Sequence, residues 1–338
     1  QPDPRKVHQH PTPLLGGASI YFAFVLTIVG NLAGVWMLRS FADIEGGFLA
    51  RLIAQGSAYI PGILSRTGEL AGVLIGGTVV FVVGLWDDRH TVRPQFKLSG
   101  QILAALIFFF FYFYSGERSF LFINHPVLTA VLLVTWIVGV TNAINLMDNM
   151  DGLCAGVSSI SLFFFSVVMY QLGEQTFMIL SMLALLGAIL GFLRHNFNPA
   201  RIFMGDAGSM FIGYTLACLI VISTFYTSQS KTILAIAMPP LVLAVPLFDT
   251  LTVIAIRIKR GLPIYDADKN HFSHRLVALG MTHKSAVLFI YLVTFCTGLG
   301  ALILHRADLF MGIVVLIQAA IILGLILFLE RTGKPEKS

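Results

Sequence analysis

Long apolar runs separated by short polar segments dominate this sequence. Ten of these runs have the length of about 17 to 25 residues that a helix needs to cross the hydrocarbon core of a membrane. No linker or internal repeat divides them, so residues 1–338 are predicted to form a single transmembrane domain with an all-α fold. The predicted spans are 15–38, 68–86, 98–115, 126–144, 152–170, 176–193, 208–225, 232–256, 285–304 and 308–329.

Composition supports a polytopic membrane bundle. Hydrophobic residues make up 57% of the chain and charged residues only 12%, and the mean hydropathy is +0.84. A soluble domain has about 25% charged residues, and a soluble protein with this much apolar surface would aggregate. Three cysteines all lie in apolar runs without metal-ligand spacing, so we expect them in the core: Cys154, Cys218 and Cys296.

The distribution of Lys and Arg predicts the orientation of the spans. When the first residues and every second loop are assigned to one side, that side holds sixteen of the 22 basic residues and the other side holds six. Basic residues are enriched in cytoplasmic loops, so the richer side is predicted to face the cytoplasm from the plasma membrane. The net charge of +5 is spread over several loops rather than one patch, which argues against nucleic acid as a partner.

Four polar clusters fall on the predicted cytoplasmic side, although they lie far apart in the sequence. Because membrane helices pack as bundles, loops on one face can converge on a single site. The loops on the other side carry no comparable clusters. The clusters are GLWDDRHTVRPQFK, NAINLMDNMDG, FNPARIFMGDAGS and DADKNHFSHRL.

Carboxylates in the first two clusters indicate a cation site. Asp87 and Asp88 end an apolar run, and adjacent carboxylates repel unless a cation or protons relax them. Hard oxygen ligands of this kind suit Mg²⁺. In a continuous helix Asn145, Asp148 and Asp151 would share roughly one face, and no Lys or Arg in the segment neutralises them. The simpler alternatives are a solvated helix end for the first pair and a helix cap with a turn for the second segment.

The other two clusters point to phosphate binding. Asp206 lies in IFMGDAGS just before an apolar run, and the start of a helix favours phosphate groups. His271, His274 and Arg275 occupy the most basic loop and could grip a diphosphate, the alternative being exposed loop residues. Asp249 lies inside a predicted span, either as a functional acid or as a polar contact between helices.

A metal, a phosphate grip and a site at the lipid boundary together predict phosphoryl transfer to a lipid-borne acceptor. Six motifs in order also resemble the polyprenyl-phosphate N-acetylhexosamine-1-phosphate transferase family, glycosyltransferase family 4. The histidine loop resembles that of bacterial undecaprenyl-phosphate GlcNAc-1-phosphate transferases more than that of muramoyl-pentapeptide transferases. The motifs span roughly residues 5–285 and are HQHPTPLLGG, GLWDD, NAINLMDNMDGL, FNPARIFMGDAGS, PLFD and ADKNHFSHRL.

The resemblance implies a bundle of ten or eleven transmembrane helices, with the helix that normally precedes HPTPLLGG absent here. It implies attack by the lipid phosphate on the sugar-bearing phosphorus of a UDP-N-acetylhexosamine, with GlcNAc as the expected sugar, and release of UMP. It also leaves a homodimer open. The implied roles are Mg²⁺ binding, with Mn²⁺ as an alternative metal, for Asn145 and Asp206; catalysis for Asp87, Asp88 and Asp148; and substrate binding for Asn142, Asp151, Lys97, Arg201, Phe203, His271, His274 and Arg275.

Two positions depart from the family pattern, and both bear on sugar specificity. Asn149 stands where Gly is usual, and Ser273 stands where a His is common. A muramoyl-pentapeptide-type transferase is therefore the alternative within the family. A transporter is the alternative from another class, but its site should lie near the membrane midplane, often with internal repeats. A phosphatidyltransferase is disfavoured because Asp151 and Gly152 are followed by LCAGVSS rather than that family's DGxxAR signature.

Overall fold

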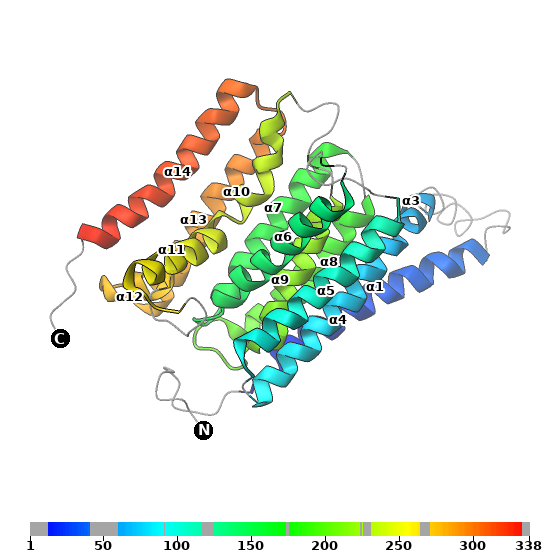
Figure 1. Cartoon of the computed structure of the whole chain (residues 1–338), viewed down its shortest axis with the longest axis horizontal. Coiled ribbons are helices and arrows are strands. Elements are labelled where there is room, and N and C mark those ends of the chain that lie inside the picture. The colour runs from blue at the N-terminus through cyan, green and yellow to red at the C-terminus, as the bar shows by residue number, and fades with distance from the viewer. Residues whose placement is uncertain are drawn as a thin grey trace.

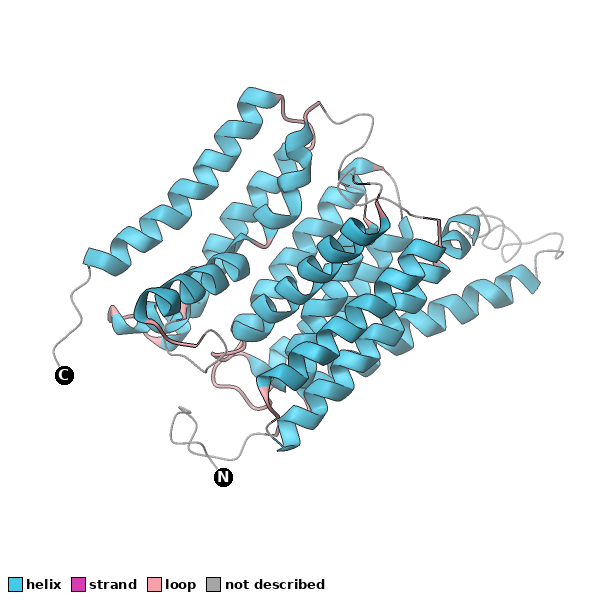
Figure 2. Ribbon diagram, in the orientation of Figure 1, coloured by secondary structure: helices cyan, strands magenta, loops and turns pink. Residues whose placement is uncertain are grey.

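The computed structural model describes residues 13–40, 60–90, 92–116, 123, 125–173, 176–223, 225, 231–263 and 271–332. Within these ranges the chain forms helices joined by turns and contains no strand, which confirms the all-α prediction (Figure 2). Parts of two predicted motifs, residues 8–12 and 264–270, lie outside the described residues, as does most of the predicted loop 39–67.

Nine helices in the described part of the chain are long and apolar enough to cross a membrane, and a bent pair raises the number to ten. Each corresponds to one of the predicted runs, so the polytopic architecture is confirmed. The helices are α1 (Gly16–Ser40), α3 (Ile60–Ser65), α4 (Thr67–His90), α5 (Pro94–Tyr114), α6 (Pro126–Leu146), α7 (Leu153–Leu172), α8 (Thr176–Asn196), α9 (Gly205–Ile222), η1 (Ile233–Ala237), α10 (Met238–Val242), α11 (Ala244–Arg260), α12 (Phe272–Ala278), α13 (His283–Leu304) and α14 (Leu309–Thr332).

Helix α9 is the centre of the bundle, because it is buried along nearly its whole length and packs against α1, α4 and α6. A Cβ atom on Gly17 of α1 would lie 2.3 Å from the backbone nitrogen of Gly208, so these two helices cross at glycine. The buried Tyr214 hydroxyl donates to the carbonyl oxygens of Gly72 at 2.9 Å and Ala104 at 3.2 Å. The central helix is thus fixed against three neighbours, and its first turn has a defined position.

The predicted span 232–256 is broken rather than continuous. Its two halves, η1 with α10 and then α11, meet at an angle of 74°. Pro246 has no N–H to donate to the carbonyl of Val242 one turn earlier, which interrupts the helical hydrogen bonds. The buried Ser161 hydroxyl lies 3.5 Å from that carbonyl oxygen and donates to it. A neighbouring helix thereby satisfies a backbone group that the lipid could not.

The predicted polar clusters meet at one end of the bundle (Figure 1, lower end). The last turn of α4, the first turn of α5, the α6–α7 turn, the α8–α9 connection, α12 and the start of α13 all lie there. This arrangement confirms that loops separated by more than a hundred residues converge on one site.

Candidate active site

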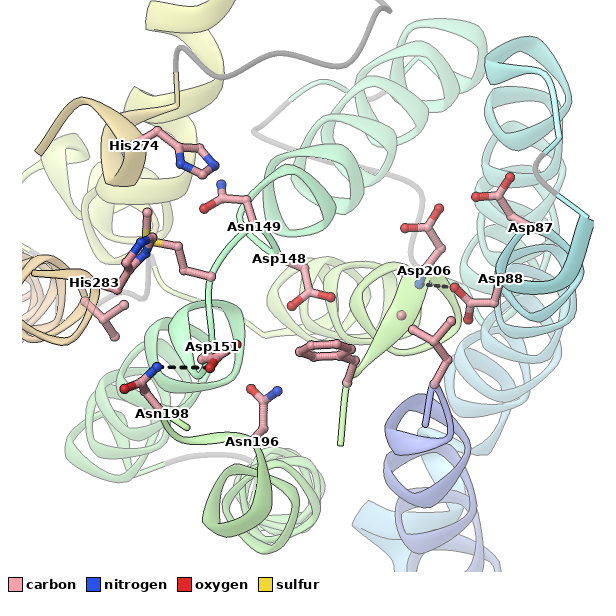
Figure 3. A pocket seen from close by; sticks show the side chains of 15 residues that line it. Asp87, Asp88, Asp148, Asn149, Asp151, Asn196, Asn198, Asp206, His274 and His283 are labelled. Atoms are coloured by element: carbon pink, nitrogen blue, oxygen red, sulfur yellow. Dashed lines mark hydrogen bonds between the residues drawn. The ribbon is translucent and has the colours of Figure 1, made fainter. Parts of the chain in front are cut away.

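A cavity of about 440 Å³ opens at this end of the bundle (Figure 3). Its lining contains five aspartates, three asparagines and two histidines, and no Lys or Arg among the residues that the structure describes. The lining residues are Leu14, Asp87, Asp88, Asp148, Asn149, Met150, Asp151, Asn196, Asn198, Phe203, Gly205, Asp206, His274, His283 and Val287.

One end of the cavity is built from charged groups of α4, α5 and α9. The Lys97 ammonium lies between two carboxylates: its Nζ is 3.0 Å from Oδ2 of Asp87 and makes a shorter contact with Oδ2 of Asp206. Asp87 also accepts a hydrogen bond from the backbone N–H of Val92 at 2.7 Å. Three helices therefore bring two acids to one cation, and we refer to this region as the acidic end.

Asp88 caps the central helix from the side. Its Oδ1 accepts from the backbone N–H of Asp206 at 2.8 Å (Figure 3). Its Oδ2 accepts from the backbone N–H of Ala207 at 3.2 Å. Gly205 permits this contact, since its φ is +68° and a Cβ there would lie 2.5 Å from Oδ2 of Asp88. A carboxylate in this place satisfies two of the unpaired N–H groups at the helix start and complements its positive end. Asp88 thus fixes the position of Asp206.

Asn145 joins α6 to the same turn of α9. Its Nδ2 donates to Oδ1 of Asp206 at 3.0 Å and to the Ser209 hydroxyl at 2.8 Å. The predicted companions Asp148 and Asp151 do not share a helix with it, because α6 ends at Leu146 and both acids lie in the α6–α7 turn. The expectation of one helical face is therefore wrong: Gly152, with a φ of +76°, directs the chain out of one helix and into the next.

The floor of the cavity is held together by amides of the α8–α9 connection. Asn198 Nδ2 and the backbone N–H of Ala200 donate to Oδ2 of Asp151 at 3.1 and 3.0 Å. Asn196 accepts from the Gly152 N–H at 2.9 Å and donates to the Ile202 carbonyl at 2.9 Å. Asp151 is therefore engaged in joining two loops. Asp148 lies in the middle of the cavity, between Asn149 and Asp206 (Figure 3).

The wall opposite the acidic end carries the two histidines, His274 from α12 and His283 from the first turn of α13 (Figure 3). Asn149 lies between this wall and the acids. Its Oδ1 accepts from the Ser273 hydroxyl at 2.6 Å, and its Nδ2 donates to the Leu146 carbonyl at 2.9 Å. The two departures from the family pattern are therefore in direct contact.

Five residues predicted to bind substrate do not line the cavity. One of them, Lys97, contacts the lining residues Asp87 and Asp206. His271 is 5% exposed and contacts Oδ2 of Asp249 at 3.0 Å. Arg275 lies near Thr252 and Glu330, with Nη2 3.2 Å from the threonine hydroxyl and Nε 2.9 Å from Oε1 of the glutamate. The other two are Asn142, which exchanges hydrogen bonds with Gln101, and Arg201, which is exposed.

Three polar lining residues were not predicted from the sequence: Asn196, Asn198 and His283. Asn198 lies within the motif FNPARIFMGDAGS, and Asn196 directly precedes that motif. The signal for both is an amide side chain placed just after the end of a predicted span. His283 is preceded by Thr282, whose hydroxyl accepts from the Ser285 N–H at 3.2 Å and caps α13. The Thr-His-Lys-Ser sequence is a recognisable helix start, but it carries no signal for the cavity.

An apolar helical bundle with a polar, carboxylate-lined cavity at one end is the architecture of a polytopic membrane protein with a site for a polar ligand. Residues 70–224 match the family described as glycosyl transferase family 4. The chain is 33% identical over 335 residues to the probable undecaprenyl-phosphate N-acetylglucosaminyl 1-phosphate transferase of Bacillus subtilis, a match covering 96% of this chain and 82% of that protein. The protein therefore belongs to glycosyl transferase family 4, and the predicted resemblance is confirmed.

Other relatives separate the two activities considered within the family. The decaprenyl-phosphate N-acetylglucosaminephosphotransferase of Mycobacterium leprae is 31% identical over 323 residues, covering 89% of this chain and 75% of that protein. The phospho-N-acetylmuramoyl-pentapeptide-transferase of Limosilactobacillus fermentum is 34% identical over 170 residues, covering only 46% of this chain and 52% of that protein. The alignment with the N-acetylglucosamine-phosphate transferases thus covers more of this chain than the alignment with the pentapeptide transferase. Family membership also removes the transporter alternative.

Proposed function

We propose that this protein transfers N-acetylglucosamine-1-phosphate from UDP-GlcNAc to a polyprenyl phosphate and releases UMP. Two relatives that align with at least 89% of the chain carry names for transfer of this sugar phosphate to undecaprenyl or decaprenyl phosphate. The observation that carries the proposal is the meeting of Asp87, Asp88 and Asp206 in the cavity at the start of the central helix, with the Lys97 ammonium in contact with two of them.

In the proposed reaction, an oxygen of the acceptor phosphate attacks the sugar-bearing phosphorus of the donor. A new P–O bond forms a lipid diphosphate, the bond from that phosphorus to the bridging oxygen breaks, and UMP leaves with the electron pair. Catalysis of this kind rests mostly on positioning and charge stabilisation. The Lys97 ammonium neutralises phosphate oxygens, and Asp88 keeps the first turn of α9 in place. Asp87 holds the Lys97 ammonium, which attracts the incoming acceptor phosphate.

The acidic end also fits a magnesium ion, with Mn²⁺ as an alternative. No group of three or more His, Cys, Asp and Glu side chains in the described ranges forms a ready metal site. Mg²⁺ needs no such group, since it is usually held by one or two carboxylates together with water and substrate phosphates. Asp206 and the amide of Asn145 would supply protein ligands. The bound ion would neutralise charge on the phosphates of both substrates.

The remainder of the cavity suits the uncharged part of a nucleotide sugar. Amides and imidazoles line it, and such groups can donate to and accept from sugar hydroxyls. Phe203 offers an aromatic face next to the acidic end, where a uracil ring could stack. The surplus of Lys and Arg on the same side of the membrane supports a cytoplasmic position for the cavity, where nucleotide sugars are available.

The test follows UMP release by the purified full chain in detergent, with undecaprenyl phosphate, Mg²⁺ and UDP-GlcNAc. We expect UMP only when lipid and metal are both present, and none after addition of EDTA. Release from UDP-MurNAc-pentapeptide but not from UDP-GlcNAc would overturn the proposed donor and keep the class of reaction. UMP that forms without the lipid would overturn the proposed transfer, and activity unchanged by EDTA would overturn the metal.

A further inference from the structure

The side chain of Asn149 connects the α6–α7 turn with the helix that carries His274. Asn149 is in the α6–α7 turn, directly after Asp148, and Ser273 is in α12, directly before His274. The Ser273 hydroxyl donates to Oδ1 of Asn149 at 2.6 Å across 124 positions of sequence. Ser273 is 1% exposed, so its hydroxyl is shielded from water, while Asn149 is part-buried at the cavity.

Asn149 is fixed at both ends of its amide group. Its Nδ2 donates to the carbonyl oxygen of Leu146, the last residue of α6, at 2.9 Å. The oxygen that receives the Ser273 hydroxyl therefore has a defined position relative to the end of a membrane-spanning helix. A rigid acceptor of this kind can hold a short element in place, because little freedom is lost when the bond forms.

The element that it holds is short and needs such contacts. Helix α12 has seven residues, too few for a stable helix without tertiary support. Its start is anchored by Asp249, whose Oδ1 accepts from the Phe272 N–H at 2.6 Å. That anchor fixes where α12 begins, and the contact with Asn149 fixes how the same first turn lies against the cavity. The side chain that follows Ser273 is His274, which lines the cavity (Figure 3).

We propose that the Asn149–Ser273 hydrogen bond positions His274 for binding of the nucleotide-sugar donor, which makes both residues determinants of donor affinity. The inference rests on the proposed function. It concerns the donor rather than the acceptor, because the polar groups beside this bond are amides and imidazoles, which can donate to and accept from sugar hydroxyls. Neither residue takes part in the chemical step, since Asp87, Asp206 and Lys97 lie at the other end of the cavity.

The experiment compares Asn149→Ala, Ser273→Ala and the double variant with the unchanged full chain in the UMP-release assay. Each single variant should raise the KM for UDP-GlcNAc about fivefold, as expected for loss of one hydrogen bond, and leave kcat and the KM for undecaprenyl phosphate within about twofold. The double variant should be no worse than either single one, because both remove the same contact. Ser273→Thr keeps the hydroxyl and should restore most of the donor affinity.

A matched control is Ser285→Ala. Ser285 is an exposed serine in the first turn of the neighbouring helix, its hydroxyl contacts Thr282, and it is not among the cavity residues. Its donor KM should stay unchanged. Thermal unfolding in detergent identifies a variant that has lost its fold. If one of Asn149→Ala and Ser273→Ala is unfolded, the other still removes the same hydrogen bond and tests the proposal.

The outcomes separate this inference from the proposed function. An active wild-type protein whose donor KM is unaffected by either alanine variant, or whose two alanine effects simply add, overturns the positioning role alone. Equal changes in the KM values of donor and acceptor overturn it as well, since a general loosening of the fold would produce them. A wild-type protein that releases no UMP with any UDP-N-acetylhexosamine overturns the proposed function and this inference together.

Discussion

The acidic end of the cavity and the wall formed by α12 differ in the charge of their side chains and in the length of the helices that carry them. At the acidic end, Asp87, Lys97 and Asp206 are charged groups held close to one another on three membrane-spanning helices. At the α12 wall, polar side chains such as Asn149 and Ser273 position a seven-residue helix that lies outside the spans. The first region places charge on rigid elements, and the second places neutral donors and acceptors on a short element that must be held.

This difference indicates how binding and chemistry are divided in the cavity. Charge stabilisation depends on groups that cannot move away when charge develops, and long packed helices provide such rigidity. Recognition of a sugar depends on hydrogen-bonding groups whose arrangement can vary without loss of the reaction. Variants at the acidic end should therefore act mainly on kcat, and variants at the α12 wall should act on donor KM or on stability.

The largest effect is expected at Asp206. Asp206→Ala removes the carboxylate that meets Lys97 and Asn145, so turnover should fall at least about 10³-fold. Asp308→Ala is the matched control, because Asp308 caps the start of α14 through the Met311 N–H at 2.8 Å and is not in the cavity. That variant should lose about 1 kcal/mol of stability and keep its kcat. UMP release within tenfold of wild type for Asp206→Ala would contradict the assignment.

Asp88 should show the next largest effect and sharpen the distinction between positioning and chemistry. Asp88→Ala removes both acceptors from the start of α9, and we expect turnover to fall about 10²-fold because Asp206 is displaced. Asp88→Asn keeps one carbonyl oxygen and should recover part of this loss. The kcat values of the two variants provide the measurement. An asparagine variant as inactive as the alanine variant would instead indicate that the negative charge of Asp88 acts in the reaction.

Asp249 tests whether the α12 region responds through stability. It is 2% exposed and accepts from the Phe272 N–H, while His271 Nδ1 lies 3.0 Å from its Oδ2. Asp249→Ala leaves these groups unpaired in the interior, which should lower the free energy of unfolding by about 2 kcal/mol. We expect a lower melting temperature in detergent and a kcat within about fivefold. A kcat that falls as far as in Asp206→Ala, with melting unchanged, would place Asp249 in the chemistry.

The smallest effect is expected at Arg201, which the sequence analysis counted among the substrate-binding residues. Its side chain is exposed and does not line the cavity, and the backbone N–H donates to the His195 carbonyl at 2.8 Å whatever the side chain. Arg201→Ala should change kcat and both KM values by less than about twofold, within the range of a surface substitution. Steady-state kinetics of Arg201→Ala and Lys97→Ala compare the two basic residues, and we expect Lys97→Ala to lose most of its activity. A tenfold rise in donor KM for Arg201→Ala would restore its predicted role.

Much of the fold could be predicted because each membrane span is visible in the sequence as a long apolar run. Each of the ten apolar runs has a helical counterpart, and alternation of the spans brought the acidic motifs to one end of the bundle. The break in 232–256 was not predicted, because Pro246 is compatible with a kinked span and the sharp bend depends on packing against other helices, including the contact with Ser161. The shared helical face of Asn145, Asp148 and Asp151 failed for a related reason, since α6 ends between the first residue and the other two.

The histidine loop shows most clearly what spacing could not provide. His271 and His274 are three positions apart, and both were expected to contact substrate. His271 precedes α12 with an extended backbone, φ −65° and ψ 149°, and contacts the buried Asp249, whereas His274 lies within the helix and lines the cavity. His271 is buried rather than His274 because its partner, Asp249, comes from another helix, and the local spacing does not show this.

The sequence by itself determined the class of fold, the family, and the end of the bundle at which the polar motifs gather. It could do so because membrane burial requires long apolar helices, and the number of spans between two motifs decides whether they lie on the same side. Only the tertiary structure decided which residues share the cavity, that Asp88 caps the central helix, and that Asn149 meets Ser273. These contacts join residues more than a hundred positions apart, and their geometry follows from how the helices pack against one another rather than from local spacing.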